Sequence, residues 1–336
     1  MRDVARAAGV SVSTASRVLS GSAHPVSEAA RSRVTAAAAA LGFEPNRLAR
    51  ALATARSRTI GVVVHDVSDP YFADIIRGLE DVAGPRDHAL FVTSSDRDAA
   101  KELSLVRAFV AHRVDAIVLV ASGLTTPGYL DDLTGILKRF KDLGGVVVAM
   151  SEHAYPAPRV GFDNAGSSAM ITRHLIDLGH RRIGHLAGPP ELAVSASRED
   201  GYRRALAEAG LEAGPDLVEC GWFGMEEGSS ATARLMDRAA PTAIVAANDL
   251  MAFGALRHLL DQGVSIPDQV SVAGFDDIEF AAYASVPLTT VRIPLTQFGR
   301  LGAELVFELL AGGSPDPWPS VTPELVIRGS SGRAPT

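Results

Sequence analysis

Four hydroxyl groups and one guanidinium lie close together within residues 11–17. On a helix, residues three and four apart share a face, and here one such face gathers small or hydrogen-bonding side chains. These are Val12, Ser13, Ser16 and Arg17. A guanidinium so placed matches the acceptor edge of guanine in the major groove of DNA. The pattern fits base recognition, and it fits an ordinary solvated helix face equally well.

Two short helices joined by a tight turn would position this face. Apolar residues recur at helical spacing on both sides of the turn, namely Val4, Ala5 and Ala8 before it and Ala15, Val18 and Leu19 after it. Gly9 can adopt the positive φ that the turn requires, and Ser11 is placed to cap the second helix. This pattern predicts a helix-turn-helix, although such hairpins are common outside DNA-binding proteins. A third helix is expected from the cap Ser27 to Gly42, with Phe43 packed back on the three-helix core.

The charge distribution favours DNA binding. Residues 1–60 contain nine arginines and no lysine against three acidic residues, a net charge of +6. The remainder has 23 basic and 36 acidic residues, a net charge of −13, so that the whole chain carries −7. A basic head on an acidic body is expected when one segment meets a polyanion and the rest does not.

Composition excludes several classes of protein. The 336 residues are 47% hydrophobic and 21% charged, which is typical of a soluble globular chain of two or three domains. The sequence has no apolar run long enough to span a membrane and no signal-peptide core near its start. Its single cysteine, Cys220, excludes an internal disulfide and a multi-cysteine metal site. A cytoplasmic protein without metal or cofactor is expected.

Residues 45–58 form a segment rich in alanine and arginine, with Leu48 and Leu52 one helical turn apart. A helix this short is marginal in water by itself. One interpretation is a charged, partly helical linker between domains. The other is a hinge that folds on DNA, with its arginines on phosphates and Leu52 wedged between base steps of the minor groove.

From residue 60 onward, buried-strand runs alternate with helical stretches. The strand-like runs are 60–64, 89–93, 116–120, 146–150, 182–186, 217–220, 243–246 and 270–275, and the helical stretches include 72–82, 101–112, 165–178, 198–209, 228–238 and 250–262. This alternation predicts parallel sheets covered on both faces. Two sheets fit the remaining chain better than one, with a break near 162–164 and a return near 288–295.

A cleft between two such sheets is the expected ligand site, because ligands bind outside the carboxyl ends of parallel strands. Tyr71 and Phe72 follow the first strand, and Phe223 follows the sixth. These rings could stack on a sugar or a base, or simply pack in the core.

Ten short motifs occur in a characteristic order along nearly the whole chain. They include Ala8-Gly9-Val10-Ser11, Ser16-Arg17-Val18-Leu19, Pro45-Asn46, Ile60-Gly61-Val62-Val63, Leu178-Gly179-His180-Arg181-Arg182-Ile183, Gly201-Tyr202, Ala247-Asn248-Asp249, Gly274-Phe275-Asp276-Asp277 and Pro287-Leu288-Thr289-Thr290. Any one motif is weak evidence, but together they make the chain resemble a LacI/GalR-family bacterial transcriptional regulator.

The resemblance implies a fold and a mode of action. It implies an all-α helix-turn-helix headpiece (1–44), a hinge helix (45–58) and an α/β core of two doubly wound, periplasmic-binding-protein-like (type I) subdomains. The first would cover mainly 59–162, with crossovers at about 289–320, the second 163–288, and a C-terminal strand and tail 321–336. It also implies a homodimer that reads a pseudo-palindromic operator, with an affinity altered by a small molecule in the cleft.

The resemblance also implies roles for individual residues. Toward DNA, Val12, Ser13 and Arg17 would face base edges, Ser11, Thr14, Ser16 and Asn46 would contact phosphates or backbone, and Ala49 and Leu52 would enter the minor groove. Toward the effector, Arg198, Asn248 and Asp276 stand at the family's polar ligand positions, joined by Ser122, Tyr71, Phe72 and Phe223. Ser11 could instead serve only as a cap, and Leu52 could pack on its own domain.

Three departures from the family pattern bear on these expectations. The chain lacks the helix-capping threonine that usually precedes Asp3, which leaves open an upstream start or a weakened headpiece. Ser151-Glu152 stands where many relatives have Asp-Arg, so a ligand carboxylate is expected to be missing there. The end at Gly332–Thr336 has no leucine heptad, which favours a dimer over a tetramer.

Other functions were weighed against this interpretation. An enzyme is disfavoured, since no dinucleotide-binding glycine motif, P-loop or nucleophile elbow is present. A solute-binding protein would need a signal peptide and no basic head. The favoured function is therefore ligand-responsive regulation, more plausibly repression than activation, with a sugar as effector and a nucleobase as the alternative. Whether the ligand induces or co-represses, and which operator and genes are involved, the sequence leaves open.

Overall fold

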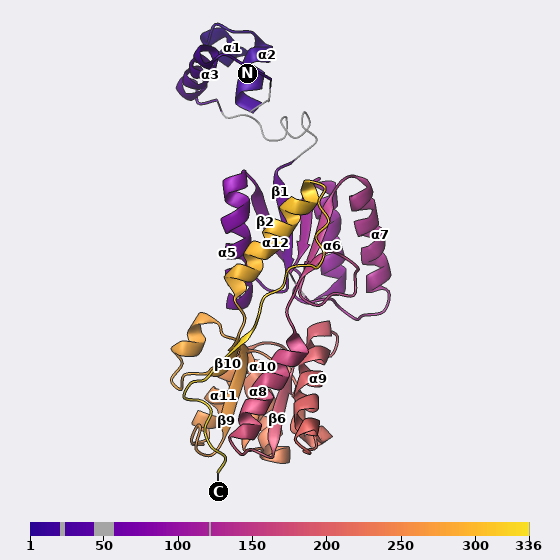
Figure 1. Ribbon diagram of the computed structural model, residues 1–336, viewed down its shortest axis with the longest axis vertical. Helices are drawn as coiled ribbons and strands as arrows, with labels where there is room; N and C mark the ends of the chain where they lie inside the picture. Colours follow the sequence, from indigo (N-terminus) through magenta and orange to yellow (C-terminus); the bar gives the residue numbers. More distant parts are fainter. Residues whose placement is uncertain (21–23, 44–56, 121, 336) are drawn as a thin grey trace. The chain divides into compact units, whose positions relative to one another are not determined.

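The computed structural model describes residues 1–20, 24–43, 57–120 and 122–335 (Figure 1). Contacts divide the chain into two compact units. The first comprises residues 1–58 with 113–115, and the second comprises 59–112 with 116–336.

Residues 1–20 and 24–43 of the first unit contain three helices, α1 (Arg2–Ala7), α2 (Val12–Ser20) and α3 (Glu28–Ala40). Their buried core consists of Val4, Ala5, Ala8, Ala15, Val18, Val34 and Ala38, with Leu19 and Phe43 packed against it. Gly9 and Gly42 have φ values of 62° and 56°, which confirms the predicted turn and helix end. Ser27 caps α3 by accepting a hydrogen bond from the Ala30 amide. The three-helix prediction is confirmed.

Asp115 binds the last residues of the predicted linker, also within the first unit. Its carboxylate accepts hydrogen bonds from the Ser57 amide (2.8 Å) and the Arg58 amide (2.9 Å). These two residues directly precede the first strand in the sequence. Asp115 therefore fixes the end of the segment that joins headpiece and core.

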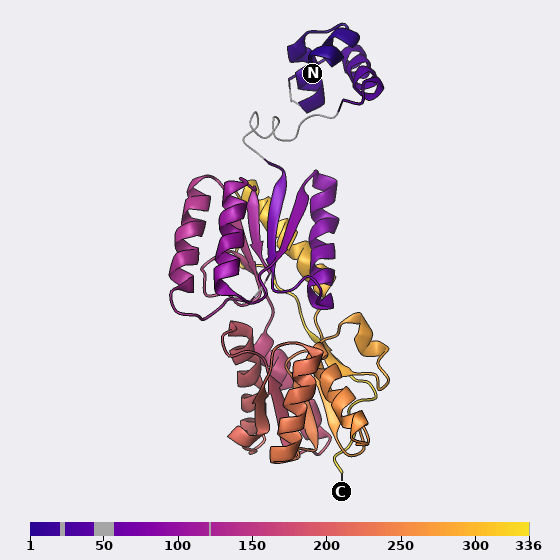
Figure 2. The same ribbon diagram turned by 180° about the vertical axis from the view of Figure 1, so that it is seen from behind.

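The second unit contains two sheets, and the first of them forms what we call the N-lobe. Its five strands are parallel in the order β2-β1-β3-β4-β5. They span β1 Thr59–Val64, β2 Ala89–Ser94, β3 Ala116–Leu119, β4 Val146–Met150 and β5 Arg159–Val160. The helices are α5 (Pro70–Ala83), α6 (Ala99–Ala111), α7 (Tyr129–Asp142) and α12 (Leu295–Leu310). Helix α12 crosses the sheet in front in Figure 1 and lies behind it in Figure 2.

The second sheet forms the C-lobe and has the order β11-β10-β9-β8-β6-β7. Its strands are β6 Ile183–Ala187, β7 Val218–Cys220, β8 Ala243–Ala246, β9 Ser271–Asp276, β10 Thr289–Arg292 and β11 Glu324–Val326. All pair in parallel except β11, which is antiparallel to β10. Helices α8 (Asn164–Asp177), α9 (Ala193–Glu208), α10 (Met225–Ala239) and α11 (Asp249–Asp261) cover it, α8 beside α9 and α10 beside α11.

The eight predicted strands all exist, each within about one residue of its expected position. Three short 3-10 turns, Gly84–Arg86, Pro215–Leu217 and Glu279–Ala282, were not predicted, and neither was α7. The segment expected to hold the crossovers, about 289–320, contains β10 in the C-lobe sheet and then α12 on the N-lobe. Within the described residues, no helix is both long and apolar enough to cross a membrane.

Helices α5 and α12 approach each other through two glycines. A Cβ atom added to Gly299 would lie 2.1 Å from the carbonyl oxygen of Ile75, and one added to Gly78 would lie 2.1 Å from that of Thr296. Real Cβ atoms do not come this close to backbone, so the contact requires glycine on both helices. It holds α12, which follows the C-lobe strand β10, firmly against the N-lobe.

The Gly299→Ala substitution should therefore lower the free energy of unfolding by roughly 1–3 kcal/mol, because the added methyl group forces the helices apart. Gly135→Ala is the matched control, since Gly135 is also helical but has nothing within 4 Å of its Cβ position. Alanine there should leave stability unchanged or raise it slightly. Denaturant titration measures the free energy of unfolding of both variants. Equal changes in the two would show that the close contact between α5 and α12 does not require glycine.

Candidate functional site

The exposed face of α2 is the first candidate site. Ser11 caps this helix, accepting a hydrogen bond from the Thr14 amide at 3.1 Å, and its Oγ lies 2.8 Å from the hydroxyls of Ser13 and Thr14. Val12 is 47% exposed, and Ser13, Ser16 and Arg17 are exposed as well. The side chains predicted to face base edges are therefore accessible, whereas the Ser11 oxygen already has local partners.

The residues predicted to contact the minor groove and the DNA backbone from the hinge cannot be placed on this face. Asn46, Ala49 and Leu52 fall outside the described residues, so their roles stay predictions. The helix α2 contains no acidic residue in its first turn, which suits approach to a polyanion.

The second candidate site is a pocket in the second unit, with an empty volume of about 460 Å³. All seven side chains predicted to contact an effector line it, although they come from segments far apart in the sequence. They are Tyr71, Phe72 and Ser122 of the N-lobe and Arg198, Phe223, Asn248 and Asp276 of the C-lobe. Their convergence follows from the topology, because most of them lie just beyond the carboxyl ends of strands. Effector binding by these residues remains a prediction.

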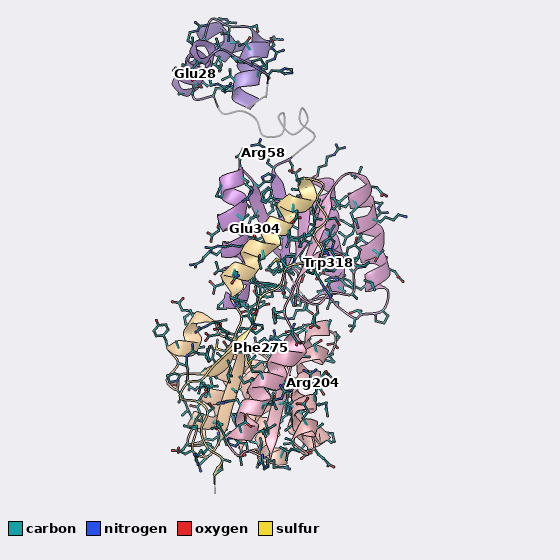
Figure 3. All side chains as sticks on the ribbon, in the orientation of Figure 1. Glu28, Arg58, Arg204, Phe275, Glu304 and Trp318 are labelled. Atoms are coloured by element: carbon teal, nitrogen blue, oxygen red, sulfur yellow. The ribbon has the colours of Figure 1, made fainter. Side chains whose placement is uncertain are left out.

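Arg198 is the most constrained group of the pocket. Its side chain is buried, and Nε donates to the Asn164 side-chain oxygen at 3.0 Å while Nη1 donates to the Ala247 carbonyl. Its guanidinium carbon lies 3.8 Å from the centre of the Phe275 ring, which Figure 3 labels at the end of the C-lobe facing the N-lobe. Nη2 lies 3.5 Å from Asp276, a long contact. All three guanidinium nitrogens therefore have protein partners that hold the group in place, and the contact with Asp276 is the longest of them.

Asp276 faces this guanidinium from the end of β9. Burial raises the pKa of its carboxyl group well above the usual value, and the charge of Arg198 opposes that shift. Its φ is 111°, a left-handed conformation that is strained for a residue with a Cβ atom. A carboxyl and a guanidinium side by side can bind adjacent hydroxyl groups, one as acceptor and the other as donor.

Asn248 and Ser122 also serve the scaffold. The Asn248 side-chain oxygen caps α11 through the Met251 amide at 2.9 Å, and its Nδ2 donates to the Phe223 carbonyl at 3.2 Å. The Ser122 hydroxyl accepts a hydrogen bond from the Val194 amide at 3.1 Å, which links the two lobes. Both residues can offer a ligand only part of their hydrogen-bonding capacity.

The aromatic side chains differ in how much they offer a ligand. Phe72 is 6% exposed and packs in the core cluster as well as lining the pocket. Tyr71 stands edge-on to it at 5.0 Å between ring centres and is only partly buried. Phe223 is also buried, at 9% exposure, so Tyr71 is the best placed of the three to stack on a ligand.

Four polar residues that line the pocket were not among the predicted effector contacts, namely His65, Asp69, Arg97 and Ser151. His65 follows β1 and donates from Nε2 to the Ser122 carbonyl at 3.2 Å. Burial and the charge of Arg97 lower the pKa of His65 to about 3, so its ring is neutral at physiological pH. Asp69 caps α5, and Arg97 follows β2. Because these residues follow strands, the sequence could have indicated that they line the pocket, just as it did for Tyr71.

Glu152 lies between the lobes and supports Arg198 indirectly. Its carboxylate accepts hydrogen bonds from the Asn164 side-chain nitrogen (3.1 Å) and from the Ser197 hydroxyl. Asn164 in turn holds Arg198, so a residue that follows the N-lobe strand β4 fixes a pocket residue of the C-lobe. The Glu152 carboxylate is not among the pocket-lining groups, whereas the neighbouring Ser151 lines the pocket.

Replacing Glu152 by alanine should lower the free energy of unfolding by roughly 1–3 kcal/mol, because the buried Asn164 amide loses its acceptor. Glu304→Ala on the exposed surface of α12 (labelled in Figure 3) is the control and should change it by less than about 0.5 kcal/mol. Denaturant titration compares the two variants. A Glu152→Ala protein as stable as the control would show that the bridge contributes nothing.

Comparison with known proteins places the two candidate sites in context. Residues 1–46 match the family described as bacterial regulatory proteins, lacI family, and residues 172–331 match the periplasmic binding protein-like domain. The transcriptional regulator GalS of Salmonella typhimurium is 38% identical over 316 residues, which are 93% of this chain and 90% of GalS.

Two solved structures resemble the whole chain. The lac repressor dimer bound to operator and the anti-inducer ONPF has a TM-score of 0.85 at 25% identity, and the match covers 98% of each chain. The complex of the transcriptional regulator CelR with cellobiose has a TM-score of 0.73 at 31% identity, also over 98% of each chain.

Proposed function

The chain belongs to the LacI family of bacterial transcriptional regulators, and we propose that it is a homodimeric repressor whose operator affinity is set by a sugar bound between its lobes. The observation that carries the effector part of this proposal is the convergence of seven predicted side chains on one pocket. The solved relatives support it, since one is a complex with cellobiose and another is a dimer on its operator.

In this proposal, helix α2 of the headpiece (residues 1–44) enters the major groove of one operator half-site. Val12, Ser13 and Arg17 read base edges, while Ser11, Thr14, Ser16 and Asn46 contact the backbone. The linker 45–58 places Ala49 and Leu52 in the minor groove at the operator centre. A pseudo-palindromic site follows from the two-fold symmetry of a dimer. The protein acts where its DNA lies, in the cytoplasm, and no catalytic step is part of the proposal.

A ligand in the pocket would act by its differential affinity for two arrangements of the lobes. It contacts Tyr71 and Ser122 on one side and Arg198, Phe223 and Asp276 on the other, so it binds best when the lobes are at one particular angle. Because Ser122 and Glu152 already bridge the lobes, a change in this angle also changes their hydrogen bonds. Ligand binding and operator binding are thereby thermodynamically coupled.

Operator binding with and without candidate effectors tests the proposal. The purified full-length protein is tested by footprinting on the DNA upstream of its own gene, at one fixed salt concentration. It is tested alone and with each member of a panel of sugars and nucleobases. Protection of a palindrome that one sugar abolishes or strengthens is the expected result. A nucleobase that acts instead would replace the sugar and keep the regulator, and specific binding that no compound alters would contradict a ligand-responsive function.

The Arg17→Ala variant should bind its operator roughly 5- to 150-fold more weakly, since one good base contact is worth about 1–3 kcal/mol. It should also discriminate less between the operator and variants changed at the contacted base. Arg6→Ala is the control, because Arg6 is exposed in the same unit but lies on α1, near Asp3. Fluorescence anisotropy titrations measure the affinity of each variant for the operator and for the altered operator. Equal weakening on all sequences would show that Arg17 contacts a phosphate rather than a base.

A further inference from the structure

Arg97 is the one positively charged side chain that lines the pocket, within the described residues, without belonging to the expected effector set. Its Nε is buried without a hydrogen-bond partner, and its guanidinium carbon lies 5.7 Å from the centre of the Phe223 ring. Within the described part of the chain, no carboxylate forms a close ion pair with Arg97, in contrast to the Arg198 guanidinium of the C-lobe. A partly buried guanidinium with an unused donor requires an acceptor from outside the protein, either water or a ligand.

The backbone around Arg97 is held in an uncommon conformation that directs this side chain into the pocket. Asp96 and Arg97 have φ values of 53° and 59°, two successive left-handed residues that are not glycine. The loop keeps this shape through the Asp96 amide, which donates to the His65 carbonyl at 2.8 Å, and through Asp98, which caps α6. Such strain persists only where the surrounding structure enforces it, and it gathers at ligand sites.

The carboxylates around Arg97 have other partners or lie on the surface, although their charges, that of Asp69 most of all, favour the protonated guanidinium. Asp66 accepts hydrogen bonds from the amide and hydroxyl of Ser68, and Asp96 pairs with Lys101. Asp69 caps α5, and burial raises the pKa of its carboxyl group. Glu227, which acts on Arg97 across the cleft through its charge, is exposed on α10, where water screens it.

We propose that the effector of this regulator carries an acidic group, a carboxylate or a phosphate, which Arg97 binds while Arg198 and Asp276 bind its hydroxyl groups. The proposal rests on the sugar-like effector proposed above and narrows it to sugar acids or sugar phosphates. A guanidinium binds either anion through two parallel hydrogen bonds. Because Arg97 belongs to the N-lobe and Arg198 to the C-lobe, such a ligand spans the cleft from end to end and ties its binding to lobe closure.

Calorimetric titration of the full-length protein with three matched series tests this. The series are neutral aldohexoses, the aldonic and uronic acids of the same hexoses, and their monophosphates. An acid or phosphate should bind roughly 10- to 100-fold more tightly than its neutral parent, as expected for one charge-assisted pair. Its affinity should fall as salt is added, whereas that of the neutral parent should not. The series that shows the preference distinguishes carboxylate from phosphate.

The variants assign the preference to Arg97. Arg97→Gln should abolish the preference for the anion and keep the affinity for the neutral parent, and Arg97→Lys should retain part of it because the charge remains. Arg107→Gln, at an exposed arginine of α6, should behave as the unaltered protein. A denaturant titration of each variant establishes that it is folded.

Two results would overturn the proposal, and they differ in what else they remove. Equal affinity for acids and neutral hexoses, unchanged in Arg97→Gln, would refute the acidic group and leave the sugar-responsive regulator standing. No binding by any compound of the three series would refute the sugar-like effector as well, while operator binding by the same preparation would still identify a DNA-binding regulator.

Discussion

The buried guanidinium of Arg198 is the constraint on which the pocket depends. A charge taken out of water is costly unless hydrogen bonds and a counter-charge replace its hydration. Here Asn164 of α8, the Ala247 carbonyl after β8, and the Phe275 ring and Asp276 at the end of β9 supply that environment. Because Asn164 is itself held by Glu152 from the other lobe, the position of the guanidinium depends on how the lobes meet.

The connections between the two lobes bear on how binding of a small molecule in the pocket could affect the rest of the protein. The N-lobe is completed by α12, which follows the C-lobe strand β10, and the chain returns to the C-lobe at β11. The lobes are therefore connected by three chain crossings and by the bonds of Ser122 and Glu152. The proposed ligand would therefore act on a connected pair of lobes rather than on a single loop.

Most of the fold could be predicted from sequence because local signals were strong. Alternating apolar runs located eight strands, and Gly9, Ser11, Ser27 and Gly42 marked helix ends through the conformations and caps they favour. Tyr71 and Asp276 could be placed in the pocket because they follow strands. Arg97 also follows a strand, but the conformation of its loop depends on two successive left-handed residues, Asp96 and Arg97, and no glycine in the sequence indicates that conformation. The alternation of apolar runs did not assign α12 to a lobe, because long-range packing decides this, and only the family resemblance placed crossovers at about 289–320.

The distance between the lobes tests the central claim most directly. With Cys220 replaced by serine, spin labels attached through Lys141→Cys on α7 and Arg204→Cys on α9 report one exposed site in each lobe. Pulsed electron paramagnetic resonance then measures the distribution of distances between the two labels in three states. These are the free protein, the protein bound to its operator, and the protein bound to whichever hexose, sugar acid or sugar phosphate it binds. The account predicts that ligand and operator favour different distributions. One distribution common to all three states would contradict it.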